Sequence, residues 1–185
     1  MKIIAPMLLL ATLLFPLSAH AEEMQPGDDG LYHPSWFLNS FLDLRDDHAE
    51  ATKEGKNLAI IWEQKGCSYC KRMHTEYFSD QKLVGWISAH FVIVQLDLHG
   101  SRVVTDFDGE ALQESEYARK HGIRLTPTIQ FFRKDLKNKQ KDQEREAARM
   151  PGLLEPNDFI GMFHYVSDTD GQGQNYRSYM KNWRP

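Results

Sequence analysis

Cys67 and Cys70 are the residues with the most evident capacity for chemistry. They are the two cysteines of the chain, and Ser68 and Tyr69 separate them. A disulfide between them closes a very short loop, which stabilises a fold less than a long loop does. Redox chemistry therefore explains the pair better than a structural staple. We predict thiol-disulfide exchange at these two positions.

The flanking sequence predicts how the pair is held. Residues 57–62 are a short apolar run typical of a buried strand, and residues 70–78 have the pattern of a helix. Two cysteines at i and i+3 share one helix face, with Cα atoms about 5 to 6 Å apart, as a disulfide requires. Cys67 lies at the helix N-terminus, where the helix dipole favours a thiolate. We expect Cys67 to be the exposed nucleophile and Cys70 the shielded resolving thiol.

Two other uses of the cysteines receive less support. A c-type haem requires His directly after the second cysteine, and Lys71 stands there. Zinc could use Cys67, Cys70 and His74, but a closed structural site takes four ligands and the chain has no second cysteine pair. We expect no metal and no organic cofactor, and we expect His74 to lie at the helix surface or half-buried.

The first 21 residues have the pattern of a secretory signal peptide. Lys2 precedes an apolar run over residues 3–17, and Ala19-His20-Ala21 is a small-x-small cleavage pattern. The alternative is an uncleaved anchor. We expect export to the periplasm, an oxidising compartment, without stable membrane insertion after cleavage.

Composition indicates one globular domain. The chain has 185 residues, 41% hydrophobic and 26% charged, which excludes a disordered tail or a collagen. The formal net charge of −4 argues against a nucleic-acid partner. We predict a signal peptide at 1–21, a lead-in at 22–32, one domain at 33–168, and a C-terminal extension with a short helix at 169–185.

Hydrophobic periodicity predicts an α/β layer around the cysteines, because helices and apolar strands alternate along the chain. An amphipathic helix is expected from Phe37, Phe41, Leu44, His48 and Ala51. A solvated loop is expected at 99–110 and a mobile charged extension or hairpin at 133–149. The remaining expected elements are a helix after Asp80, a strand at 90–97, a helix at 111–121, a strand at 124–132, a helix from Pro156 and a short helix at 176–183.

With these motifs placed, the chain resembles thioredoxin-fold proteins over residues 33–168. Three segments carry the resemblance: residues 62–73 around Cys-Ser-Tyr-Cys, residues 117–132 with Thr126-Pro127-Thr128, and Met150-Pro151-Gly152. The lead-in and the insert at 103–111 are further similar to periplasmic thioredoxins associated with sulfur-oxidation gene clusters. The resemblance implies a thioredoxin-like fold, with a central mixed β-sheet flanked by helices on both faces.

The resemblance also implies roles for particular residues. The Thr126-Pro127 peptide bond is expected to be cis and to face the cysteines, so that Thr126, Pro127, Ser68 and Tyr69 contact the substrate. The family's buried carboxylate, six residues before the first cysteine, falls on Ile61 here. Glu63 lies on the same strand face and is a candidate proton shuttle. A surface glutamate is the alternative.

The predicted function is a periplasmic thiol-disulfide oxidoreductase that reduces disulfides of exported proteins or small sulfur compounds. The resemblance implies a membrane-embedded thiol electron donor that resets the Cys67-Cys70 pair. One alternative is a disulfide-forming oxidase or isomerase of the same fold, although Tyr69 lacks the charge of the His that strong oxidants commonly place between their cysteines. The other is a non-catalytic binding module or chaperone.

Overall fold

The computed structural model describes residues 25–137, 139 and 141–184. The predicted signal peptide at 1–21 lies outside these residues. Within the described ranges, no helix combines the length and the apolar character needed to cross a bilayer.

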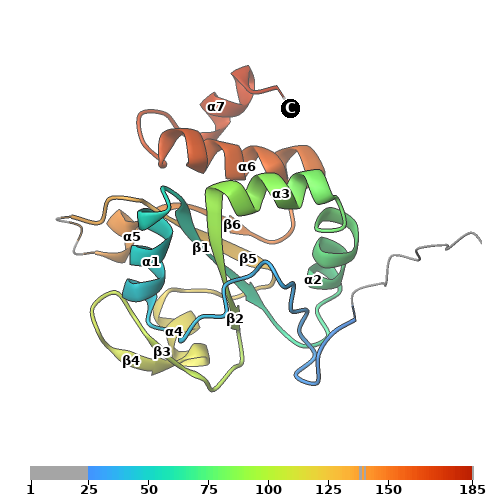
Figure 1. Cartoon of the computed structure of the whole chain (residues 1–185), viewed down its shortest axis with the longest axis vertical. Coiled ribbons are helices and arrows are strands. Elements are labelled where there is room, and N and C mark those ends of the chain that lie inside the picture. The colour runs from blue at the N-terminus through green and yellow to red at the C-terminus, as the bar shows by residue number, and fades with distance from the viewer. Residues whose placement is uncertain (1–24, 138, 140, 185) are drawn as a thin grey trace, which may run out of the picture.

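A four-stranded mixed sheet in the order β2-β1-β5-β6 forms the centre of the molecule (Figure 1). Strand β1 (Asn57–Glu63) is buried at every residue, as its apolar sequence predicts. It pairs parallel to β2 (Phe91–Asp97) and antiparallel to β5 (Thr128–Phe132). Strand β6 (Glu146–Pro151) pairs antiparallel to β5 at the other edge. The parallel pair is joined by a helical crossover, as such a pair requires.

Helices cover both faces of this sheet, which confirms the predicted fold class. Alternate residues of β1 enter different cores, because successive side chains of a strand point to opposite faces. Leu58 and Ile60 pack with α1 and α4, whereas Ala59 and Ile61 pack with η1, α3 and α6. The helices are α1 (Leu44–Lys53), α2 (Ser68–Arg72), the π-helical turn η1 (Met73–Tyr77), α3 (Gln81–His90), α4 (Glu114–Lys120), α5 (Asp142–Arg145), α6 (Pro156–Thr169) and α7 (Tyr176–Asn182).

The helix predicted from Phe37 onward is wrong over its first turns. Leu42 has a φ of 64°, which interrupts any helix, and Asp43 then caps α1 by accepting a hydrogen bond from the Arg45 N–H. Phe41, which fitted the apolar stripe, is fully exposed. The segment before α1 instead runs along the outer edge of β2, where the Leu38 N–H donates to the Ile93 carbonyl over 2.8 Å.

The loop predicted at 99–110 is mostly exposed, but a short strand and a buried turn interrupt it. Strands β3 (Val103–Thr105) and β4 (Ala111–Gln113) form a hairpin there. Asp106, in the connection, is 2% exposed and forms an ion pair with Lys120 at 2.5 Å. Its Oδ1 also accepts the backbone N–H groups of Asp108 and Glu110, both at 2.8 Å. The buried carboxylate therefore organises the turn.

Of the two forms predicted for the charged segment 133–149, the hairpin is confirmed, because β6 returns antiparallel beside β5, and the extension is wrong. Its second half supplies α5 and β6, because the free edge of β5 offers backbone hydrogen bonds to any chain that reaches it. Arg145 is 6% exposed and forms an ion pair with Asp108 at 2.5 Å. The charged residue Arg145 of this segment is therefore held by a specific ion pair.

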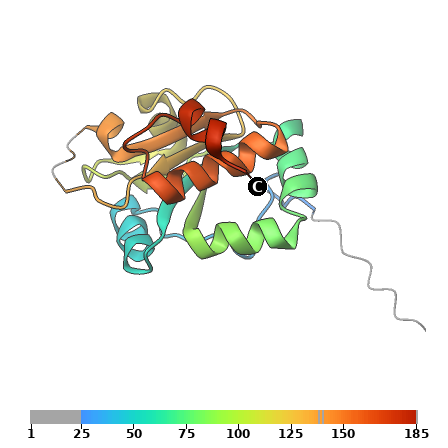
Figure 2. The ribbon, with the colours of Figure 1, turned by 90° about the horizontal axis from the view of Figure 1, so that it is seen from above.

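The short C-terminal helix is confirmed as α7, and it packs on α6 (Figure 2). The Tyr179 ring lies 5.5 Å from that of Tyr165, and its hydroxyl donates to Asp168 over 2.5 Å. Met180 fills the space beside Gly161, where a Cβ would clash with its thioether. The aromatic stripe of α7 therefore packs inward, as its spacing predicts.

Candidate active site

The cysteine pair lies where β1 passes into α2. Gly66 has a φ of 76°, a left-handed conformation that glycine adopts at little cost, and it turns the chain at the end of the strand. Cys67 is then the N-cap of α2, and its Sγ accepts a hydrogen bond from the Cys70 N–H over 3.1 Å. The two cysteines form a disulfide with Cα atoms 5.2 Å apart, within the predicted range.

The two sulfurs differ in access to solvent. Cys67 is half-buried, whereas Cys70 is only 2% exposed. Ser68 is exposed, and so is Tyr69, with 57% of its surface accessible. In the dithiol form, the N–H that now faces the Cys67 sulfur is placed to stabilise a thiolate there. Cys67 is therefore the more accessible of the two sulfurs.

The Thr126-Pro127 peptide bond is cis, as the resemblance implies. Thr128, the next residue, pairs with Trp62 in the antiparallel ladder between β5 and β1. The chain therefore enters β5 beside the end of β1 that leads to Cys67. Pro127 is buried, and Leu125, two residues earlier, is 47% exposed.

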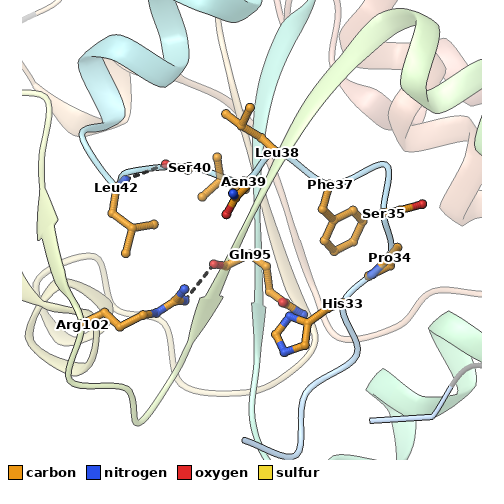
Figure 3. A pocket seen from close by; sticks show the side chains of 11 residues that line it. His33, Pro34, Ser35, Phe37, Leu38, Asn39, Ser40, Leu42, Gln95 and Arg102 are labelled. Atoms are coloured by element: carbon orange, nitrogen blue, oxygen red, sulfur yellow. Dashed lines mark hydrogen bonds between the residues drawn. The ribbon is translucent and has the colours of Figure 1, made fainter. Parts of the chain in front are cut away.

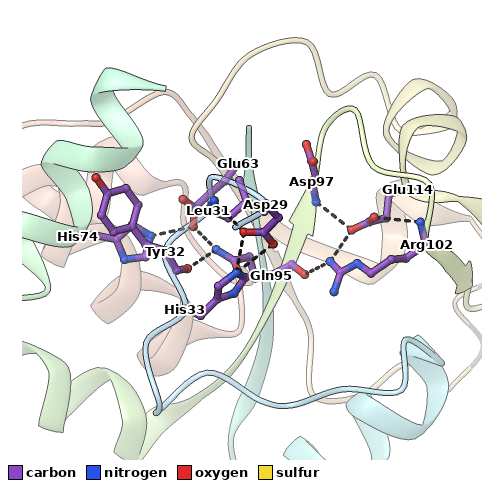
Figure 4. Close-up of polar contacts among 10 residues, drawn as sticks. All are labelled: Asp29, Leu31, Tyr32, His33, Glu63, His74, Gln95, Asp97, Arg102 and Glu114. Atoms are coloured by element: carbon purple, nitrogen blue, oxygen red, sulfur yellow. Dashed lines mark hydrogen bonds and ion pairs between the residues drawn. The ribbon is translucent and has the colours of Figure 1, made fainter. Parts of the chain in front are cut away.

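Glu63 is completely buried, so the surface alternative considered for it is wrong. It is the last residue of β1 and lies against His74 of η1. Its Oε1 is hydrogen-bonded to Nε2 of His74 at 2.9 Å and to Nε2 of Gln95 at 2.8 Å (Figure 4). His74 is 1% exposed, contrary to the surface or half-buried position expected of it. Its ring stacks on Tyr32 with centroids 4.9 Å apart.

A cavity of about 190 Å³ joins this carboxylate to the cysteines, since Glu63, Cys67 and Cys70 all line it. The lining also includes Pro26 and Tyr32, from the N-terminal segment at residues 25–43. Leu31 and Tyr32 are buried, so the end of the predicted lead-in belongs to the packed domain.

Gln95 connects this site with a second cavity, of about 240 Å³, between the N-terminal segment and β2 (Figure 3). Arg102 also lines the second cavity, and its Nη2 donates to the Gln95 carbonyl over 3.1 Å. The same guanidinium forms an ion pair with the buried Glu114 at 2.5 Å.

Sequence reasoning missed His74, Tyr32 and Gln95 as parts of the site. Two signals were present in the sequence: His74 follows Cys70 by one helical turn, and Glu63 lies two residues after inward-facing Ile61 and so on the same strand face. Together they place an acid and an imidazole on facing elements. Throughout the described part of the chain, no group of three His, Cys, Asp or Glu side chains converges in a way that could hold a metal ion.

The known thioredoxin-like domain matches residues 44–167 of this sequence. The chain belongs to the thioredoxin-like domain family. This family, together with a redox-capable cysteine pair at the tip of α2, identifies the protein as a thiol-disulfide oxidoreductase, as the sequence predicts. No match is found among curated proteins.

Three solved structures illustrate the fold. A thioredoxin-fold protein from Helicobacter pylori has a TM-score of 0.51 at 18% identity, over 68% of this chain and 83% of its own. A thioredoxin from Thermus thermophilus has a TM-score of 0.50 at 22% identity, over 70% and 86%. A disulphide isomerase from Xylella fastidiosa Temecula1 has a TM-score of 0.50 at 14% identity, over 74% and 97%. At these identities the likeness shows the fold alone.

Proposed function

We propose that this thioredoxin-like protein is a periplasmic reductase of disulfides in exported proteins or small sulfur compounds. The observation that carries the proposal is the asymmetry of the pair, with Cys67 half-buried at a helix tip and Cys70 2% exposed behind it. Only the Cys67 sulfur is accessible enough to contact a bulky substrate. The lead-in and residues 103–111 resemble those of periplasmic thioredoxins associated with sulfur-oxidation gene clusters. This resemblance favours small sulfur compounds as substrates.

The reaction proceeds by two exchanges. The Cys67 thiolate attacks a substrate disulfide, forming a bond to one substrate sulfur while the other leaves as a thiolate. The Cys70 sulfur then attacks Cys67, forming the intramolecular disulfide and releasing the second substrate sulfur. The substrate gains two electrons, and the protein is oxidised to the form in which its cysteines are bonded. A membrane-embedded thiol donor returns the electrons.

Glu63 is the proposed proton acceptor for Cys70. It lies at one end of the cavity that both cysteines line, and the cavity has room for water that could relay a proton. A carboxylate in this place can take the thiol proton as the Cys70 sulfur attacks. It returns the proton when the pair is reduced again.

Substrate contacts are assigned to the surface around Cys67. Ser68 and Tyr69 are exposed beside it, and Thr126 and Pro127 open β5 at the same end of the sheet. The exposed Tyr69 and Leu125 side chains suit an unfolded or extended polypeptide, which presents apolar groups.

Insulin reduction with dithiothreitol present tests the catalytic activity. The wild type should accelerate precipitation of the insulin B chain, and Cys67→Ser should abolish the acceleration. Cys70→Ser should trap a mixed disulfide on Cys67, and Cys67→Ser should trap none. A wild type no faster than dithiothreitol alone would identify a binding module or chaperone instead.

The reduction potential decides the direction of the reaction. Equilibration with glutathione should give a value near roughly −200 to −270 mV, as reductants have, whereas a value near roughly −120 mV would indicate an oxidase. Cell fractionation tests the compartment. The chain expressed with residues 1–21 should appear in the periplasmic fraction and lack those residues, and the chain without them should stay in the cytoplasm.

A further inference from the structure

The two oxygens of the Glu63 carboxylate have different surroundings. Gln95 directs one amide hydrogen to the Tyr32 carbonyl, at 2.7 Å, and the other to Glu63 Oε1, at 2.8 Å. Because a backbone carbonyl only accepts, the contact fixes which end of the amide carries the hydrogens. His74 Nε2 lies 2.9 Å from the same Oε1. The other oxygen, Oε2, is buried and has no hydrogen-bond partner among the described residues.

This arrangement leaves one place for an incoming proton. When the Glu63 carboxylate is ionised it only accepts hydrogen bonds, and in that state the His74 Nε2–H donates to Oε1. With two donors on Oε1, the open lone pairs of Glu63 are on Oε2. His74 and Gln95 thus hold the carboxyl group in one rotation, with Oε2 as its proton-accepting oxygen.

The His74 ring is itself held by aromatic neighbours. Tyr32 stacks on it at an interplanar angle of 20°, and the rings of Phe78 and Phe37 lie 5.4 and 5.9 Å away. Within the part of the chain that the structure describes, its second nitrogen, Nδ1, is buried without a partner, so the hydrogen bond to Glu63 is the one polar contact there that orients the ring. The polar contact of this buried imidazole is therefore with Glu63, the acid of the site.

We infer that His74 is a positioning residue that turns the free oxygen of Glu63 toward the cavity shared with Cys70. The inference rests on the proposed function. As the Cys70 sulfur bonds to Cys67, the bond from Cys67 to the substrate sulfur breaks. The Cys70 proton passes through cavity water to Glu63 Oε2, and the substrate sulfur leaves as a thiolate that takes a proton from solvent. Loss of the His74 donor lets the carboxyl group rotate and slows this second exchange.

Stopped-flow reaction of the reduced protein with the aromatic disulfide DTNB separates the two exchanges. The first release of thionitrobenzoate is bimolecular and reports attack by Cys67. The second is independent of the DTNB concentration and reports attack by Cys70 on the mixed disulfide. The variants are Glu63→Gln, His74→Phe, His74→Gln and the double variant Glu63→Gln/His74→Phe. His90→Phe is the matched control, because His90 is also a stacked histidine but lies on α3, against Trp86.

At pH 6.5, Glu63→Gln should slow the second release about a hundredfold and His74→Phe about tenfold. His74→Gln retains a side-chain N–H donor and should recover most of the rate. The double variant should be no slower than Glu63→Gln, because the two residues act through one oxygen. At pH 9.5 the thiol ionises without help, so all rates should lie within about threefold of the wild type. His90→Phe should match the wild type at both pH values.

A uniform loss of packing would slow the reaction equally at both pH values. The inference is overturned if the His74→Phe defect at pH 6.5 persists at pH 9.5, if His74→Phe equals the wild type, or if His74→Gln is as slow as His74→Phe. If circular dichroism shows His74→Phe unfolded, Gln95→Leu removes the other donor to Oε1, and the same pH-dependent slowing is expected. A wild type that releases one thionitrobenzoate alone overturns the proposed function as well.

Discussion

Asp47 should make the protein less stable as the pH rises toward neutrality. It lies in the first turn of α1 and is 5% exposed. Both carboxyl oxygens contact the single hydroxyl of Ser40, at 2.8 and 2.7 Å, so one donor serves two acceptors. Burial, aided by the nearby charges of Glu50, Asp43 and Asp46, raises the pKa of Asp47 to about 6.

The direction of this pH dependence follows from the linkage between proton binding and folding. A carboxyl whose folded pKa lies above its ordinary value of 3.8 binds its proton more tightly in the folded protein. Its contribution to stability is fully present below pH 3.8 and is lost as the pH rises through 6. A difference of about two pH units corresponds to about 3 kcal/mol, which solvent screening reduces to about 1 to 2 kcal/mol.

Asp47→Asn removes the ionisation and keeps the shape. Urea unfolding should show the variant more stable than the wild type by about 1 to 2 kcal/mol at pH 7.5, with a melting temperature about 3 to 6 °C higher. At pH 4 the two should agree within about 0.5 kcal/mol. Asp28→Asn, at an exposed position, is the control and should give no gain at pH 7.5. An equal effect of Asp47→Asn at both pH values would refute the reasoning.

Three other substitutions have defined outcomes. Trp62→Phe removes the 2.6 Å hydrogen bond from the indole N–H to buried Gln130, and urea unfolding should show a loss of about 1 to 3 kcal/mol; an unchanged midpoint would contradict this. Gly66→Ala adds a methyl group with no atom within 4 Å, so only the positive φ should destabilise the variant. Urea unfolding should show a loss of about 1 kcal/mol in the free energy of unfolding, and a much larger loss would be inconsistent with an open site. Tyr69→Ala should raise the KM for insulin while the melting temperature stays constant, because its side chain is 57% exposed; an unaltered KM would remove Tyr69 from the substrate surface.

The elements around the cysteines could be predicted because their patterns are local. The apolar run at 57–62 needed no knowledge of the partner strands to be recognised as buried, and β1 confirms it. The i, i+3 spacing of the cysteines likewise fixed their separation, since helix geometry alone sets it.

The failures occurred where long-range contacts decide the structure. Leu42 adopts a positive φ that its residue type disfavours, and the pairing of Asp43 with Thr105 stabilises that path. Strand β6 is rich in alanine and charge, and it becomes a strand because the edge of β5 is free to pair. Contact between Glu63 and His74 depends on how the helix packs over the strand, which neither segment reveals alone.

The proposed thiol-disulfide exchange requires the two sulfurs to differ in reactivity. Brief treatment of the reduced protein with substoichiometric iodoacetamide at pH 7, followed by peptide mass spectrometry, measures that difference. Cys67 should be alkylated at least about tenfold faster than Cys70, because it is the accessible sulfur at the helix tip. Equal labelling, or faster labelling of Cys70, would contradict the account.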